Sequence, residues 1–231
     1  MGHLSSLSKK LWRFFFPVVC PGCAGVLPHN TESFFCNKCW DQLIGQCLVS
    51  PEIENPATGD GNYCDHIWVA LTYAGIVSTV MHRFKYGGYR WLERELSSVG
   101  SEILNRCIPY APDIVVPVPM SRNRERRRGY NQADLLARNI ASQFNTEYRR
   151  GLLRWRQRTS PQMELKREER FHNVHNAIAA NLNACGNNLR GQTVLVVDDV
   201  CTTGATLNEC ARALKHADAK AVWGFALCHG Q

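Results

Sequence analysis

The sequence has 231 residues, of which 45% are hydrophobic and 20% are charged. This length suits one globular core with a small appendage, and no apolar run reaches the ~18 residues that a membrane-spanning helix needs. The net charge of +7 is concentrated: residues 122–130 carry five arginines against one glutamate, and residues 149–170 carry eight basic residues against three glutamates. Such local basicity indicates a phosphorylated ligand or a polyanion, with solvated helix faces as the alternative.

The N-terminal segment resembles the beginning of a secretory signal. Lys9 and Lys10 precede an apolar run, but Arg13 and Pro17 interrupt it, and no small-residue cleavage site follows before the first cysteine pair. We expect residues 1–19 to form a helical lead docked on the protein. Weak adhesion to a membrane surface is the alternative.

Four of the eleven cysteines form two C-x-x-C pairs separated by twelve residues. Each pair can present two thiolates to one tetrahedral ion, and four thiolates favour a closed structural Zn²⁺ site in a zinc knuckle over residues 20–47. Disulfides, free buried thiols and an iron–sulfur cluster are the alternatives. Metal-binding thiols indicate a reducing compartment, so we expect a cytoplasmic protein. The predicted metal ligands are Cys20, Cys23, Cys36 and Cys39.

Prolines, glycines, asparagine and aspartate predict a linker over residues 48–64, between the knuckle and a large domain over 65–231. Cys47 and Cys64 border this linker, and each lacks a nearby partner cysteine. We therefore do not assign them as metal ligands.

The large domain begins with elements typical of an α/β fold. Apolar and aromatic residues predict a strand over 67–73, and helical periodicity predicts helices over 75–85 and 89–107. Two glycines end the first of these helices, beside Lys85. This lysine either reaches a phosphate or caps the helix end.

A second strand is predicted over residues 113–119, where two prolines force the chain to turn. The arginines of residues 122–128 follow as a loop, and a helix containing Leu135 and Ile140 comes next. Ligands of open α/β sheets bind at the C-terminal ends of strands, so pyrophosphate is the natural partner of this basic loop. The candidate ligands for pyrophosphate or nucleic acid are Arg127, Arg128 and Lys85. Residues 151–177 are polar, basic and interrupted by proline, which suits a loop that closes on a phosphate ligand; a surface helix is the alternative.

The stretch 193–206 contains the strongest signal in the chain. Residues 193–197 predict a strand buried on both faces, two carboxylates follow at its end, and a threonine-rich loop leads into a helix. Loop N–H groups and a helix N-terminus bind phosphate, whereas carboxylates suit a diol or Mg²⁺. The alternative is a capped helix beside a solvated acidic pair. A last strand is predicted over 221–228. The candidate ligands are Asp198, Asp199, Thr202, Thr203, Gly204, Ala205 and Thr206.

The segment 196–206 resembles the phosphoribosyl-pyrophosphate motif of type I phosphoribosyltransferases. The stretches 117–133 and 158–174 are similar to the ComF family, competence-associated proteins with that fold, and the cysteine knuckle also stands at the family's position. The resemblance implies an α/β fold: a type I phosphoribosyltransferase-like parallel sheet flanked by helices, with a small N-terminal zinc knuckle of four cysteines.

The resemblance also implies roles for particular residues. Asp198 and Asp199 would be the catalytic pair that holds the ribose hydroxyls, the following loop would hold the 5′-phosphate, and residues 151–177 would form a mobile hood. Two departures matter. Thr202 stands where purine-salvage members carry aspartate, so we expect no purine salvage. Cys47 and Cys64 stand where family members often carry two further C-x-x-C pairs, which puts a second metal site in doubt.

Two functions remain open at this stage. The first is Mg²⁺-dependent binding of phosphoribosyl pyrophosphate, with transfer of the phosphoribosyl group to an unknown acceptor, in a protein associated with DNA uptake or the use of exogenous DNA. The second is a non-catalytic module that keeps the fold and binds single-stranded DNA. Proteins of the DNA-uptake machinery are candidate partners under both, and the alternative to a fully cytoplasmic location is peripheral attachment at the inner face of the membrane.

Overall fold

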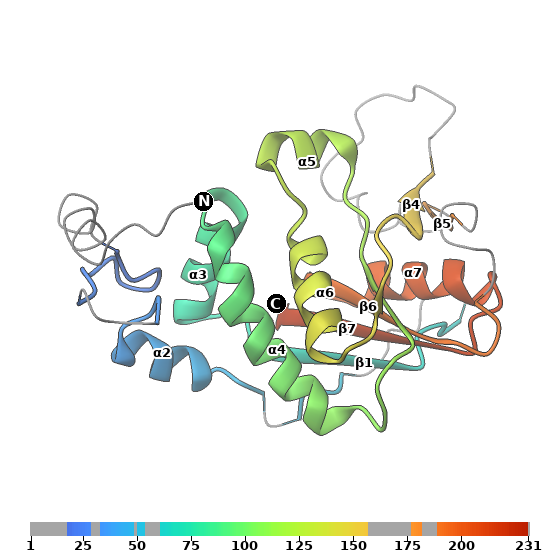
Figure 1. Cartoon of the computed structure of the whole chain (residues 1–231), viewed down its shortest axis with the longest axis horizontal. Helices are drawn as coiled ribbons and strands as arrows, with labels where there is room; N and C mark the ends of the chain where they lie inside the picture. Colours follow the sequence, from blue (N-terminus) through green and yellow to red (C-terminus); the bar gives the residue numbers. More distant parts are fainter. Residues whose placement is uncertain are drawn as a thin grey trace, which may run out of the picture. The chain divides into compact units, whose positions relative to one another are not determined.

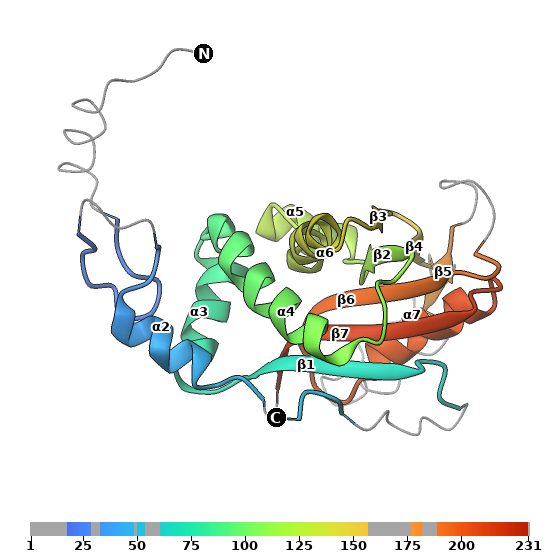
Figure 2. The same cartoon turned by 60° about the horizontal axis from the view of Figure 1, so that its bottom comes forward.

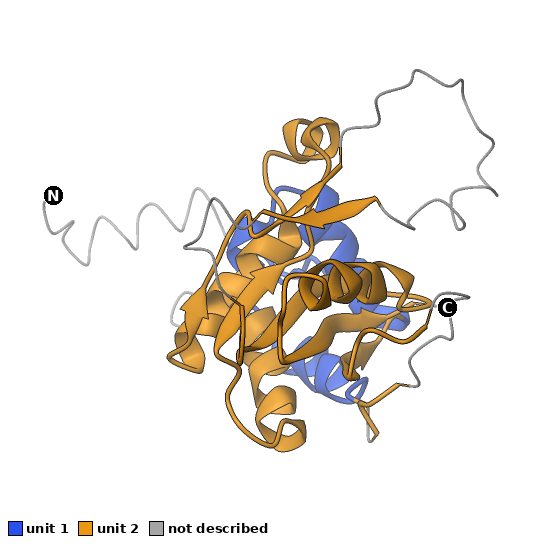
Figure 3. Cartoon of the chain, turned by 90° about the vertical axis from the view of Figure 1, so that its right-hand side faces the viewer, with its two compact units in different colours: residues 1–47, 74–92 blue, residues 48–73, 93–231 orange. Residues whose placement is uncertain are grey.

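The structure is a computed structural model whose chain divides into two compact units (Figure 3). Unit 1 contains residues 1–47 and 74–92, and unit 2 contains residues 48–73 and 93–231. Residues 74–92, which the sequence predicted to lie in the large domain, therefore group with the cysteine knuckle. The residues described are 18–28, 33–48, 50–53, 61–156, 177–181 and 189–230. Most of the N-terminal lead, part of the linker and most of the predicted hood lie outside these ranges.

The described residues of unit 1 include the two cysteine turns and the helices α2 (Asn37–Ile44) and α3 (Gly75–Tyr86), with a 3-10 turn η1 (Arg90–Leu92) after α3. α2 starts directly after Cys36 and buries Cys39 and Leu43. Arg83 of α3 donates from Nη1 to the Cys20 carbonyl at 3.2 Å, which holds α3 against the first cysteine turn. α2 was not predicted from the sequence, because eight residues show too little periodicity to be recognised.

Unit 2 contains a five-stranded sheet in the order β1-β7-β6-β2-β3, and every neighbouring pair is parallel (Figures 1 and 2). The predicted α/β fold with a parallel sheet is confirmed. The C-terminal strand lies inside the sheet, between β1 and β6. The strands are β1 (His66–Thr72), β2 (Ile114–Pro117), β3 (Glu147–Tyr148), β6 (Thr193–Cys201) and β7 (Ala221–His229).

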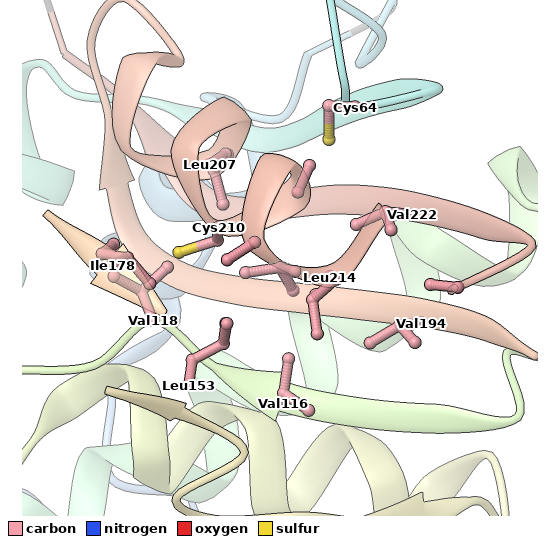
Figure 4. Packing of buried hydrophobic residues seen from close by; sticks show 14 of the residues in the cluster. Cys64, Val116, Val118, Leu153, Ile178, Val194, Leu207, Cys210, Leu214 and Val222 are labelled. Atoms are coloured by element: carbon pink, nitrogen blue, oxygen red, sulfur yellow. The ribbon is translucent and has the colours of Figure 1, made fainter. Parts of the chain in front are cut away.

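Helices cover both faces of this sheet. Gly224 of β7 faces α7 (Ala205–Lys215), since a Cβ added there would meet Leu207, whereas the next residue, Phe225, lies against Gly100 of α4 (Glu93–Cys107). This alternation is what a strand with two buried faces requires. α6 (Gln132–Gln143) contacts α4, β2 and β6. Figure 4 shows the apolar side chains of β2, β6, β7 and α7 packed together. Among the described helices, none combines the length and apolar character needed to cross a membrane.

Two predictions about unit 2 were wrong in detail. The arginines of 122–128 form a helix, α5 (Arg122–Arg128), which Gly129 ends with a left-handed φ of 83°. A loop was expected there because no apolar face marks this helix, and the structure buries none of its residues. The strand β6 also continues through the acidic pair to Cys201, because its ladder with β7 extends to the pair Cys201↔His229.

A second, two-stranded antiparallel sheet joins β4 (Leu153–Trp155) to β5 (Ile178–Ala180). β4 lies inside the predicted hood, near its first residue, whereas β5 begins directly after its last residue, 177. The start of the hood is therefore a paired strand and not the loop that the sequence predicted. The predicted mobility of the segment between the two strands stays a prediction.

A buried ion pair fastens this ribbon to α7. Arg212 is 7% exposed and Glu209 is 5% exposed, and both guanidinium–carboxylate contacts are 2.8 Å. Glu209 Oε1 also accepts from the Ile178 N–H, and Arg212 Nη2 donates to the Ile178 carbonyl, each at 3.3 Å. The pair therefore satisfies both backbone groups of the first residue of β5.

Replacing Arg212 with methionine should lower the free energy of unfolding by about 3–5 kcal/mol, because Glu209 would remain buried without its partner. The double variant Glu209→Leu/Arg212→Met should recover part of this loss, since the charge itself is removed. Urea unfolding measures the change. Arg106→Met is the control, because Arg106 and Glu102 form an exposed pair worth ~1 kcal/mol or less. A loss in Arg212→Met no larger than in the control would contradict the structural role.

Candidate functional site

The acidic pair and the threonine loop form one continuous segment at the C-terminal end of β6. Asp198 and Asp199 are half-buried within the strand, Thr202 and Thr203 are exposed, and α7 begins at Ala205. Gly204 is buried and adopts a left-handed φ of 75° at the N-cap of α7. Only a residue without a Cβ adopts this conformation at little cost, so the glycine allows the chain to turn from strand to helix in three residues.

Hydrogen bonds fix the base of this loop. The Asp199 N–H donates to Asp198 Oδ1 at 2.8 Å, and the Ala205 N–H lies 3.4 Å from Thr203 Oγ1. The Gly230 N–H donates to the Cys201 carbonyl at 2.8 Å, so the end of β7 supports the last residue of β6. The exposed threonines and the first turn of α7 therefore project from a fixed frame.

The acidic pair influences two cysteine thiols. Burial raises the pKa of the Cys201 thiol to about 11, and the negative charge of Asp198 contributes. Burial and Asp198 also raise the pKa of Cys210 on α7. The negative charge of Asp198 therefore acts on both thiols around the loop. Both thiols stay protonated near neutral pH.

The predicted pyrophosphate ligands follow the neighbouring strand. β2 pairs with β6 in parallel, with Pro117 opposite Val197, so the chain that leaves β2 emerges at the same edge as the acidic pair. Arg127 and Arg128 lie on α5, which follows β2 at this edge; Arg127 is exposed, and Arg128 donates to Gln132 at 3.1 Å. Lys85 belongs to α3 in unit 1. Its contact with a phosphate stays a prediction.

The Gly129-Tyr130-Asn131-Gln132 motif connects α5 to α6 and fixes the start of α6. Gly129 ends α5, and Asn131 caps α6 by accepting from the Ala133 N–H at 3.1 Å. The same side chain donates to the Val118 carbonyl at 3.0 Å. Asn131 thereby joins the N-terminus of α6 to the segment just after β2, which holds α5 between two fixed points.

A cavity of about 1010 Å³ opens beside this segment in unit 2. Its walls come from the chain after β2, the first turn of α5 and the β4–β5 ribbon, and include Met120, Arg122, Arg154 and Trp155. None of the residues 198–206 lines it. The cavity is therefore a separate feature from the threonine loop, and it was not predicted from the sequence.

In unit 1, Cys20, Cys23, Cys36 and Cys39 form a cluster that can hold a metal ion, with all four Sγ atoms within 4.8 Å of one another. Gly22 is required by this geometry, because a Cβ there would lie 2.7 Å from Cys39 Sγ. Burial works to raise the pKa of Cys20, but N–H groups of Cys36, Cys23 and Gly22 lower it to about 7. Backbone donors that stabilise a thiolate favour metal ligation.

One polar residue beside the loop was not predicted from the sequence. His229 ends β7, and its Nε2 lies 3.1 Å from the Thr202 carbonyl. His229 belongs to no recognisable sequence motif. Only the pairing of β7 with β6, which sets Cys201 opposite His229, shows that this histidine lies beside the loop. The contact assigns a donor role to Nε2 and stabilises the first residue of the loop.

The chain is similar to proteins of one family. The profile described as "Phosphoribosyl transferase domain" matches residues 101–230. Competence protein F of Haemophilus influenzae is 29% identical over 233 aligned positions, which cover 92% of this chain and 98% of that protein. DNA utilization protein YhgH of Escherichia coli K12 is 30% identical over 224 positions, covering 91% and 83% of the two chains. Competence protein ComFC of Bacillus subtilis is 31% identical over 143 positions, covering 62% and 55%.

Changing Asp198 to asparagine should lower the pKa of the Cys201 thiol from about 11 towards its usual value, because a nearby negative charge disfavours the thiolate. Burial remains in the variant, so the pKa should stay above the usual value. NMR of cysteine labelled at Cβ, followed against pH, measures the titration. Asp199→Asn is the matched control and should leave the Cys201 titration unchanged. The same Cys201 titration in both variants would show that Asp198 does not act on this thiol.

Proposed function

This chain belongs to the phosphoribosyl transferase domain family, within the ComF group, and on that premise we propose that it binds phosphoribosyl pyrophosphate together with Mg²⁺ at the loop between β6 and α7. One observation carries the proposal. Two carboxylates near the end of a buried parallel strand are followed, within six residues, by a left-handed glycine and a helix N-terminus. This order supplies acceptors for a diol and donors for a phosphate on adjacent turns of the chain.

Each part of the loop has a chemical role in this proposal. The N–H groups at the start of α7 and the hydroxyls of Thr202, Thr203 and Thr206 bind the 5′-phosphate, and Gly204 and Ala205 let the backbone approach it. Asp198 and Asp199 accept hydrogen bonds from the ribose 2′- and 3′-hydroxyls. When bound, Mg²⁺ neutralises charge on the pyrophosphate. The carboxylates also favour the positive charge that builds on the ribose ring when its bond to pyrophosphate breaks.

The pyrophosphate group is proposed to lie towards the chain that follows β2. Arg127 and Arg128 of α5 can neutralise it. We also propose that the phosphoribosyl group is transferred from pyrophosphate to an acceptor at this loop. Purine-salvage members carry an aspartate at the position of Thr202, so the threonine argues for an acceptor other than a purine base.

For the cysteine cluster we propose a structural Zn²⁺ site. Four thiolates fill a tetrahedral site, which suits a structural ion and leaves no position for a substrate. Thiols kept for metal binding also agree with a cytoplasmic location. Peripheral attachment at the inner face of the membrane is the second possibility that the sequence raised, and nothing in the described residues favours it.

A second candidate function is binding of single-stranded DNA, and α5 favours it. This helix carries five arginines on seven residues and buries none of them. Names of relatives refer to competence and DNA utilisation, so we propose that the chain takes part in DNA uptake or use of exogenous DNA, with proteins of the uptake machinery as partners. Both proposed functions use arginines of α5, but only binding of phosphoribosyl pyrophosphate uses the loop after β6.

Asp199→Asn should weaken the binding of phosphoribosyl pyrophosphate by ~10- to 100-fold, since a hydrogen bond to a charged group is worth ~1.5–3 kcal/mol. Titration calorimetry with Mg²⁺ measures the affinity. The control is Asp218→Asn, which removes one carboxylate from the turn before β7, where the left-handed φ of 65° suits asparagine equally well. Equal affinities of the Asp199 variant and wild type would refute the role of Asp199.

Cys36→Ser should reduce bound zinc and destabilise unit 1, because the thiolates and the ion together supply folding free energy that a small knuckle lacks. Elemental analysis gives the zinc content, and thermal unfolding gives the stability. Cys47→Ser provides the comparison, since Cys47 lies in the same unit but outside the cluster. A variant that keeps the zinc stoichiometry of wild type would count against the site.

A further inference from the structure

The cavity beside α5 has an excess of uncompensated positive charge. Four arginines and two carboxylates line it. Arg150 engages both carboxylates, with Nη2 at 2.7 Å from Glu125 and Nε at 3.4 Å from Asp134, and Asp134 also accepts from the Tyr148 hydroxyl. In the parts of the chain that the structure describes, no ion pair joins the other three arginines to an acid, and all three are exposed. These three guanidinium groups are available to an anionic ligand. The residues with the uncompensated charge are Arg122, Arg154 and Arg156.

An aromatic ring stands among these arginines. Trp155 lines the cavity, is 36% exposed, and donates from Nε1 to the Pro119 carbonyl at 2.8 Å. Its one polar group is therefore already bonded, so the ring offers a ligand only aromatic surface. The bond also fixes the ring to the chain after β2. An indole held in place loses little conformational freedom when a flat ligand stacks on it.

The backbone around Trp155 is fixed as well. In the β4–β5 ribbon, Arg154 lies opposite Ala179 and Trp155 lies opposite Ile178. Ala179 also lines the cavity, and its small side chain leaves space beside Arg154. Ile178 is gripped by the buried Glu209–Arg212 pair. The cavity wall that carries Arg154 and Trp155 is thus anchored to the core of unit 2.

We propose that this cavity binds single-stranded nucleic acid, with a base stacked on Trp155 and backbone phosphates on Arg122, Arg154 and Arg156. Proteins that bind single-stranded nucleic acid combine aromatic side chains with positive charge. The aromatic rings stack on the bases, and the basic residues bind the phosphates of the backbone. A volume of about 1010 Å³ is at the upper end for small-ligand sites and accommodates more than one nucleotide. A ligand without an aromatic group would leave Trp155 unused.

The site rests on the nucleic-acid candidate function and gives it a location. It does not depend on binding of phosphoribosyl pyrophosphate, since none of the residues 198–206 lines the cavity. The two proposals can therefore fail separately, and the variants of one site serve as controls for the other.

The test uses the full-length protein with a fluorescein-labelled single-stranded thymidylate oligonucleotide, and fluorescence anisotropy gives the affinity at several salt concentrations. Trp155→Ala should weaken binding roughly 5- to 150-fold, the range expected for loss of one base stack. Arg154→Gln/Arg156→Gln should also weaken it and reduce the slope of log affinity against log salt by about 1.4, which is two phosphate contacts of a single strand. Unlabelled thymidine monophosphate, added as competitor, distinguishes recognition of one nucleotide from recognition of a strand.

Two control variants make the outcome decisive. Arg106→Gln removes an exposed arginine outside the cavity, and Asp199→Asn alters the threonine-loop site; both should bind the oligonucleotide like wild type. If the protein binds the strand and the cavity variants match Arg106→Gln, the site is wrong while the nucleic-acid function stands. If wild type binds no strand at all, both the site and the nucleic-acid candidate are overturned. Circular dichroism of each variant verifies the fold.

Discussion

The parallel pairing of β2 and β6 is the constraint on which the proposed sites depend. Parallel strands end at the same edge of a sheet, so the acidic pair of β6 and the basic chain after β2 must emerge side by side, although they lie far apart in sequence. The register of Pro117 opposite Val197 aligns the two ends. An antiparallel arrangement would place the carboxylates and the arginines at opposite edges, and no single phosphosugar could meet both.

α7 connects this edge to the second sheet. Its N-terminus receives the chain from Gly204, and further along the helix Glu209 and Arg212 hold both backbone groups of Ile178. Burying an ion pair is costly, and this one is offset by contacts that satisfy both charged groups and two backbone groups at once. The threonine loop and the cavity wall are therefore fastened to one helix, which gives the buried ion pair a structural role in unit 2.

The sequence predicted the parts that local chemistry determines. Strand β1, the helices around 75–107 and the strand before the acidic pair follow from periodicity, and the resemblance to the ComF family is confirmed by relatives that cover most of the chain. The cysteine cluster follows from spacing alone. Helix α5 could not be predicted, because no apolar face marks it. The cavity and the contact of His229 with Thr202 depend on which strands become neighbours, and only the folded chain supplies that information.

Because the threonine loop and the cavity wall are both attached to α7, the binding of phosphoribosyl pyrophosphate and the binding of single-stranded nucleic acid could affect each other. In the two proposals, a phosphate on the threonine loop would contact the first turn of α7, whereas a nucleic-acid strand on Trp155 would contact a ribbon that α7 holds through Ile178. Any effect of one ligand on the affinity for the other must then be reciprocal, because coupling between two binding sites is a single free energy. The buried Glu209–Arg212 pair joins the two regions, because it lies on α7 and bonds to both backbone groups of Ile178.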